Sequence, residues 1–198
     1  NDIGSYAVAL GKCTMVGDQG GPFSYPGDYF SAEAPEKYKI KGSFGHPVPV
    51  VDGKTQSSGA KASAIVLKKE FTDVKDLLCI DYTSAYSTPS LDKLVRTFVY
   101  DRQGKGSFTV GDEFTANAPI RFETAITTQA NWKIIDDTHL LLTTGTEQMT
   151  VTIEASGKVA FTSETIEVNS PAYTRIGISL KEQSKDGYIR LTMRTKQL

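Results

Sequence analysis

The sequence predicts an all-β protein, a large sandwich of two antiparallel sheets. Residues that favour strands are abundant: 22 Thr, 13 Val, 13 Ile, nine Tyr, nine Phe and one Trp occupy 67 of the 198 positions. Apolar and polar residues alternate in many short runs, as in a strand with one buried face. Turn residues separate these runs at short intervals, so consecutive strands are expected to pair with each other.

The first predicted hairpin covers residues 6–16. Tyr6, Val8 and Leu10 share one face, Gly11 and Lys12 form a tight turn, and residues 13–16 return. Further strands are predicted at residues 47–51, 62–71, 77–82, 95–100, 107–110, 120–128, 132–135, 140–143, 149–154, 159–163, 175–180 and 188–194. Only residues 34–38 and 90–94 favour a helix, each about one turn long.

Residues 17–45 interrupt the regular spacing of strands. This stretch is rich in Gly, Pro and Tyr and has no strand pattern. A loop of this length in a compact domain usually carries function. We find no internal repeat, low-complexity tract or linker, so the chain is predicted to form a single domain over residues 1–198.

Charge and hydropathy exclude two classes of protein. With 22 Lys and Arg against 23 Asp and Glu, the net charge is −1, which excludes a basic nucleic-acid-binding protein. No apolar run approaches the roughly 20 residues of a membrane-spanning helix. The chain begins directly in a strand pattern without Met, so we expect it to be part of a longer protein. On that expectation, the lack of a leader does not indicate a compartment.

The residues with reactive side chains are few. Cys13 and Cys79 lie in apolar strand runs, which favours free thiols over one disulfide. We find no phosphate-binding glycine loop, nucleophile elbow or CxxC pair. The two histidines are His46 and His139, and the latter follows Asp136 and Asp137 in ordinary turn composition rather than in a metal cluster.

Three blocks near the start of the chain resemble the C-terminal β-domain of the heparinase II/III-like polysaccharide lyases. They are residues 1–6 (NDIGSY), 16–22 (VGDQGGP) and 45–56 (GHPVPVVDGKTQ), with YPGDYF at 25–30 between the last two. In that family the first block follows a His-x-His pair, the second ends a strand with Asp-x-Gly, and the third carries His-Asn before a Val-Asp-Gly turn. The order and spacing agree over about 56 residues. Pro47 is a departure, because the family usually has Asn there, so no role is assigned to that amide.

The resemblance implies a reaction and a missing partner domain. Family members cleave uronic-acid polysaccharides by β-elimination, which requires neutralisation of the uronate carboxylate, a base and a proton donor. An α-helical toroid precedes the β-domain and supplies a Tyr and an Asn or His, the β-domain supplies a His, and the His-x-His pair lies just before Asn1. We therefore expect no catalytic residue in this chain and no activity from it alone. The expected partners are an acidic polysaccharide and the protein's own N-terminal toroid, in the periplasm or secreted.

The resemblance also assigns Asp18 and His46 to a divalent metal, commonly zinc, together with a histidine just upstream of Asn1. Imidazole and carboxylate ligands suit Zn²⁺. Judged alone, Asp18 is a turn aspartate and His46 a strand-entry histidine. Because a hairpin returns its second strand to the level where the first began, Asp18 should lie beside Asn1 and Asp2. The resemblance adds His46 to this edge, and two ligands are expected to bind metal weakly or not at all.

Aromatic side chains in the long loop are candidates for contact with sugar. Tyr25, Tyr29 and Phe30 either stack on sugar rings or pack the loop onto the sheet. Of these, Tyr25 and Tyr29 are taken as candidate substrate-binding residues.

Basic residues supply one further candidate. Lys37, Lys39 and Lys41 alternate, so in an extended segment they would share a face, and Lys39 is assigned to contact with an anionic sugar chain. The alternative for these lysines is a solvated surface. Three arginines are predicted to lie on strand surfaces without a role: Arg96, Arg102 and Arg121.

Two classes of function therefore stay open. One is the β-domain of a lyase that acts on uronic-acid polysaccharides, and the other is a non-catalytic carbohydrate-binding or structural sandwich. A His-x-His pair upstream of Asn1 would favour the lyase. The particular polysaccharide is not selected by this sequence, because selectivity lies in the cleft between the two domains.

Overall fold

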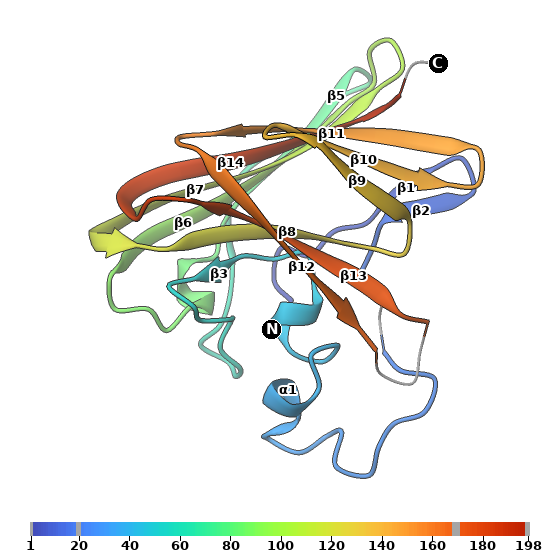
Figure 1. Ribbon diagram of the computed structural model, residues 1–198. Coiled ribbons are helices and arrows are strands. Elements are labelled where there is room, and N and C mark those ends of the chain that lie inside the picture. Colours follow the sequence, from blue (N-terminus) through green and yellow to red (C-terminus); the bar gives the residue numbers. More distant parts are fainter. Residues whose placement is uncertain (1, 19–20, 168–170, 197–198) are drawn as a thin grey trace.

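The computed structural model describes residues 2–18, 21–167 and 171–196, and it has the predicted all-β sandwich fold (Figure 1). The strands are β1 (Val8–Leu10), β2 (Cys13–Val16), β3 (Val50–Val51), β4 (Ile65–Phe71), β5 (Lys75–Asp81), β6 (Leu91–Asp101), β7 (Ser107–Ile120), β8 (Phe122–Thr128), β9 (Asn131–Asp136), β10 (His139–Thr144), β11 (Glu147–Ala155), β12 (Val159–Ile166), β13 (Tyr173–Leu180) and β14 (Ser184–Thr195). Helix α1 (Ala34–Lys37) is one turn long, and 3₁₀ turns lie at Ser43–Gly45 and Thr83–Ala85.

The two main sheets are antiparallel and face each other. The large sheet has eight strands in the order β4-β5-β6-β7-β14-β11-β10-β9, and the small sheet has four in the order β12-β13-β8-β3. Their inner faces share one apolar core, in which the rings of Phe114 on β7 and Phe122 on β8 stack with centroids 4.7 Å apart. Buried residues alternate along β7 and β11, as the period-2 pattern predicts, whereas all seven residues of β4 at the edge of the large sheet are exposed.

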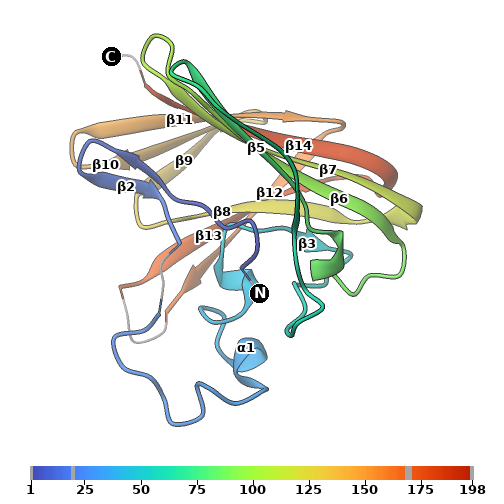
Figure 2. The same cartoon turned by 180° about the vertical axis from the view of Figure 1, so that it is seen from behind.

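Two further parts of the chain position the candidate site. The β1-β2 hairpin lies at one end of the sandwich, where β2 contacts both β10 of the large sheet and β8 of the small one (Figure 2). The segment that carries α1 packs beside the small sheet through a separate cluster of buried residues. In this cluster Tyr29 and Ile40 contact Ile166 of β12 and Tyr173 of β13.

The predicted helix at residues 90–94 is wrong, because this segment begins β6. Leu91 and Leu94 are both buried, a spacing of three residues that is typical of a helix. In the structure a register shift between Leu91 and Lys93 in the pairing with β7 produces the same spacing. A β-bulge therefore turns both leucines toward the core. The predicted turn of helix at residues 34–38 is present as α1.

Several strand boundaries differ from the predicted ones. Residues 111–119 contain Gly, Asp, Asn and Pro, which are typical of turns, yet they continue β7 because Asp112, Phe114 and Ala116 alternate inward. The predicted strand at 120–128 contains the break between β7 and β8. The predicted strand at 47–51 reduces to β3, because Pro47 and Pro49 have no N–H for a ladder.

Both cysteines are free thiols, as predicted, and both are partly buried. Among the described residues, no helix has the length and apolar character needed to span a membrane.

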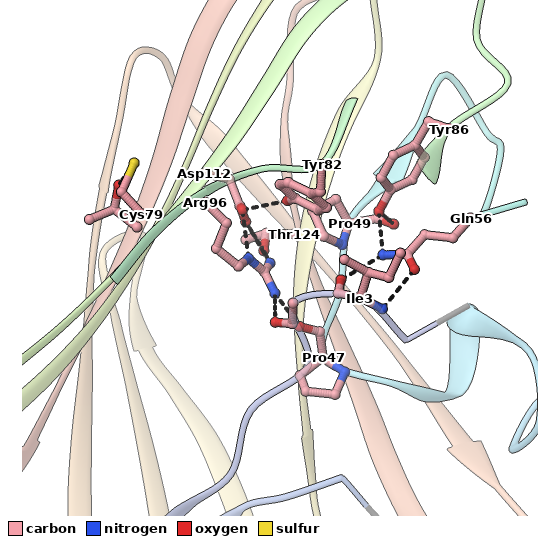
Figure 3. Close-up of polar contacts among 12 residues, drawn as sticks. Ile3, Pro47, Pro49, Gln56, Cys79, Tyr82, Tyr86, Arg96, Asp112 and Thr124 are labelled. Atoms are coloured by element: carbon pink, nitrogen blue, oxygen red, sulfur yellow. Dashed lines mark hydrogen bonds and ion pairs between the residues drawn. The ribbon is translucent and has the colours of Figure 1, made fainter. Parts of the chain in front are cut away.

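Arg96 was predicted to lie on a strand surface, but its side chain is completely buried between the sheets. Its guanidinium forms a bidentate pair with Asp112 on the neighbouring strand, with Nε–Oδ1 and Nη2–Oδ2 distances of 2.7 Å (Figure 3). The hydroxyls of Tyr82 and Thr124 donate to the same carboxylate at 2.8 and 2.7 Å. Burial raises the pKa of Tyr82 and the adjacent Asp112 charge raises it further, so this hydroxyl remains a neutral donor.

We predict that Asp112→Ala destabilises the fold by about 3–5 kcal/mol, because it leaves the Arg96 charge buried without its partner. The free energy of unfolding in urea measures this loss. As a control, Glu154→Ala removes the partner of Arg190 in an exposed ion pair on the same sheet, and should change stability by only about 0–1 kcal/mol. Equal losses for the two variants would contradict the prediction.

Candidate metal centre

Three potential metal ligands converge at one end of the sandwich. Asp2, Asp18 and His46 each offer a ligand atom, and these atoms all lie within 4.8 Å of one another. The predicted proximity of Asp18 and His46 is therefore confirmed. Asn1, which was expected beside them, lies outside the described residues. Asp2 was predicted only as a neighbour, and its carboxylate adds a third potential ligand to the two found from the sequence.

Asp18 is delivered by the end of β2. The Gly17 N–H donates to the Thr127 carbonyl of β8 at 3.0 Å, and the Thr127 hydroxyl donates back to the Gly17 carbonyl. This reciprocal pair fixes the backbone one residue before Asp18. The Ser5 hydroxyl then donates to Oδ2 of Asp18 at 2.9 Å, which orients the carboxylate.

His46 follows the 3₁₀ turn at Ser43–Gly45, and Gly45 fits a very tight space. A Cβ atom at this position would lie 2.2 Å from the Lys39 carbonyl and 2.8 Å from the Tyr173 hydroxyl. That hydroxyl donates to the Gly45 carbonyl at 3.0 Å. Burial raises the pKa of Tyr173 and the Asp18 carboxylate raises it further, so Tyr173 stays a neutral donor. Tyr173 thereby anchors the residue before His46.

The His46 side chain is only 9% exposed. Its Nδ1 atom lies 3.1 Å from Oδ2 of Asp18, but the geometry is not that of a hydrogen bond, and this buried nitrogen has no hydrogen-bond partner among the described residues. A buried nitrogen left in this way is destabilising unless another group satisfies it. Two carboxylates beside an imidazole would satisfy it jointly around a cation, and this mixed N and O donor set fits Zn²⁺.

The candidate aromatic residues of the loop divide into two groups. Tyr29 is 6% exposed and packs the loop against the small sheet, so its ring has little surface for a sugar. Tyr25 and Phe30 are 55% and 76% exposed, and their centroids lie 5.3 Å apart. Packing therefore accounts for Tyr29, whereas contact with sugar stays a prediction for Tyr25.

The three lysines do not lie in an extended segment, which is the condition for a common face, because residues 34–37 are helical and residues 38–41 form a turn. Lys37 pairs with Asp28, and Lys41 donates to a backbone carbonyl. The side chains are thus held by different local partners rather than aligned along one extended strand.

Lys39 borders a pocket at the surface. Its ammonium pairs with Glu164 and lies 5.2 Å from the centroid of the Phe44 ring. It lines a pocket of about 350 Å³ together with Ser43 and Gln56. This places Lys39 beside the turn that leads to His46, and its contact with a sugar stays a prediction.

His139 begins β10 directly after the turn at residues 137–138, where the sequence indicated a turn. The Asp136 carboxylate accepts hydrogen bonds from the Thr138 N–H at 2.8 Å and from His139 Nδ1 at 2.9 Å. These contacts, the backbone bond first, lower the pKa of Asp136 to about 2. Within the described residues, Asp2, Asp18 and His46 are the only group of three or more potential ligands with metal-binding spacing.

Comparisons with known proteins find solved structures with the same fold, but they find no match at the level of sequence. No family model and no curated protein matches this sequence. The crystal structure of heparinase III superposes with a TM-score of 0.76 at 16% identity, over 100% of this chain and 30% of that chain. The heparan sulfate lyase HepC from Pedobacter heparinus gives a TM-score of 0.75 at 15% identity, over 100% and 31%. The chain thus has the fold of a part of heparinase III and spans under a third of the length of these structures.

We predict that Gly45→Ala destabilises the protein by about 1–3 kcal/mol, because the added methyl group forces backbone apart next to His46. Thermal unfolding measures the loss. Gly27→Ala is the matched control, since no atom lies within 4 Å of a Cβ at that position. The control should stay within about 0.5 kcal/mol of the wild-type protein. A Gly45→Ala protein as stable as this control would show that the turn adjusts freely.

Proposed function

We propose that this sandwich is the carbohydrate-facing β-domain of a lyase that cleaves uronic-acid polysaccharides by β-elimination, with a divalent metal, zinc, held by Asp2, Asp18 and His46. The convergence of these three side chains on a fold shared with heparinase III carries the proposal. Asp18 and His46 come from the two sequence blocks that the resemblance assigns to metal binding, and they meet although 28 residues separate them along the chain.

The residues of this chain would bind and orient rather than transfer protons. When bound, the ion would supply positive charge at a site next to a polyanionic substrate. His46 and the two aspartates would hold it, with Ser5 orienting Asp18 and Tyr173 fixing the backbone before His46. We assign the base, the proton donor and the neutralisation of the uronate carboxylate largely to groups outside this chain, most of them on an N-terminal α-toroid. The active cleft would then lie between the two domains, in a periplasmic or secreted protein.

A second candidate function is non-catalytic carbohydrate binding. The observation that favours it is the pair of exposed rings of Tyr25 and Phe30, because aromatic faces on a loop are well suited to stack on sugars. In this case the sandwich would hold a polysaccharide without cleaving it, and the metal site would have a structural role. The two candidates differ in whether product forms, as tested below.

We predict that Zn²⁺ binds the purified chain and raises its Tm, because a ligand at 100 times its Kd stabilises the folded state by about 2.7 kcal/mol. His46→Ala and Asp18→Ala should each remove this stabilisation, since each deletes one of three ligands. His139→Ala is the control, and it should leave the shift unchanged. Calorimetric titration with Zn²⁺ gives the affinities directly. The metal assignment fails if the His46→Ala protein binds as tightly as the wild-type protein.

We further predict that the 198-residue chain alone yields no unsaturated product from heparan sulfate or other uronate polysaccharides. Each missing acid–base group typically contributes about 10²- to 10⁴-fold in rate. A protein extended to include its preceding domain should generate the ultraviolet absorbance of the unsaturated uronate. Product from the chain alone would contradict the division of roles. No product from the extended protein with any polymer would favour the binding function.

A further inference from the structure

We infer that Arg96 and Gln56 are positioning residues that hold the backbone segments bearing Asp2 and His46 in register with each other. This inference rests on the proposed metal site and explains how the sandwich shapes it. The side chain of Arg96 on β6 is completely buried, and that of Gln56, in the segment after β3, is buried as well. Both act on main-chain atoms next to the ligands (Figure 3).

Arg96 links the two segments directly. Its Nη1 atom donates to the carbonyl of Gly4 at 2.7 Å and to the carbonyl of Pro47 at 2.8 Å. Gly4 lies two residues after Asp2, and Pro47 immediately follows His46. One nitrogen therefore fixes the separation of the two segments, which come from distant parts of the chain.

The contact with Gly4 requires a close approach of the backbone to the arginine. Gly4 has a φ of +83°, a backbone conformation that residues with a side chain rarely adopt. A Cβ atom at this position would lie 3.3 Å from Cδ of Arg96. Glycine thus permits both the turn and the contact. The backbone conformation at Gly4 therefore allows its carbonyl to accept the hydrogen bond from Arg96.

Gln56 provides a second link between the same two segments. Its Oε1 accepts the Ile3 N–H at 2.9 Å and its Nε2 donates to the Ile3 carbonyl at 2.8 Å, so the side chain pairs with both backbone groups of the residue after Asp2. The Gln56 N–H donates to the Ser43 hydroxyl at 2.8 Å. Ser43 begins the 3₁₀ turn that leads into His46.

The chemistry of Arg96 matches this positioning role. All five guanidinium N–H groups have acceptors: two bond Asp112, one bonds the Thr124 hydroxyl at 3.2 Å, and two bond the carbonyls of Gly4 and Pro47. Apolar residues of similar volume often replace a buried ion pair without loss of stability, but here they would leave the carbonyls of Gly4 and Pro47 without a donor. The segments around Gly4 and Pro47 are not part of a sheet, so their carbonyls need a hydrogen-bond donor other than a neighbouring strand, and Arg96 supplies it.

Other members of the network act on Asp112 and not on the site segments. The Tyr82 hydroxyl donates to Asp112 and touches neither Gly4 nor Pro47 through a hydrogen bond. Tyr82→Phe is therefore a matched control, because it removes a buried hydrogen bond of the same network while both backbone contacts remain. Arg96→Lys keeps the positive charge beside Asp112 but has only three donors around one nitrogen.

We expect Arg96→Lys and Gln56→Met each to weaken Zn²⁺ binding by about 10- to 100-fold, the usual effect of removing a group that orients metal ligands. Tyr82→Phe should leave the affinity unchanged. Competition with a chromophoric chelator gives the affinities, and the visible spectrum of the Co²⁺ form reports a change in coordination in the two test variants alone. Circular dichroism confirms that each variant is folded. If Arg96→Lys does not fold, Gln56→Met decides the question.

Two results would overturn the inference. One is wild-type affinity in the folded test variants, and the other is an equal loss of affinity in Tyr82→Phe, which would reflect general destabilisation. If the wild-type chain binds no Zn²⁺, the proposed metal site fails. Amide hydrogen exchange measured without metal then tests whether Arg96 and Gln56 hold the segments that bear Asp2 and His46. Exchange at the amides of residues 2–5, His46 and Val48 should then rise in Arg96→Lys and Gln56→Met but not in Tyr82→Phe. Unchanged exchange in the test variants would overturn the inference.

Discussion

The guanidinium of Arg96, bonded on one side to Asp112 and on the other to two backbone carbonyls, connects the regular part of this structure to its irregular part. The strands satisfy their backbone groups through the ladders of the two sheets. The segments around Gly4 and Pro47 have no ladder, yet they lie against the core, where an unsatisfied carbonyl is destabilising. Arg96 reaches these carbonyls from the middle of β6, so the sheet determines where the segments run.

The candidate metal centre follows from this arrangement. Its three ligands are supplied by short stretches around residues 2, 18 and 46, and each stretch is held by a side chain from the sheets or from the segment after β3. Gln56 binds beside Asp2, Thr127 of β8 binds beside Asp18, and Tyr173 of β13 binds beside His46. A site fixed in this way requires little reorganisation when a ligand enters.

The long loop shows how packing and exposure are shared within one aromatic cluster. Tyr29 lies against Tyr173 and Ile166 and fastens the loop to the small sheet. Tyr25 packs on Tyr29 with ring centroids 5.0 Å apart, and yet it keeps more than half of its surface exposed. The buried ring thereby supports an exposed one close to the sheet, which is the arrangement expected where a loop offers aromatic surface to a ligand.

The sequence by itself determined the sandwich, because alternation of apolar and polar residues is a local property that decides which face of a strand is buried. Its blocks also indicated that Asp18 and His46 meet. The tertiary structure alone decided the rest. The sequence predicted Arg96 on a strand surface, whereas in the structure it shares the inner face of β6 with Leu94, and the pairing with β7 puts Asp112 opposite it. In the same way, a bulge in that pairing, and not a helix, buries Leu91 with Leu94. The position of Ile3, next to Asp2, is likewise fixed by a hydrogen bond to Gln56, 53 residues away along the chain. Local patterns specify faces, whereas partners depend on register between distant segments, which no local pattern contains.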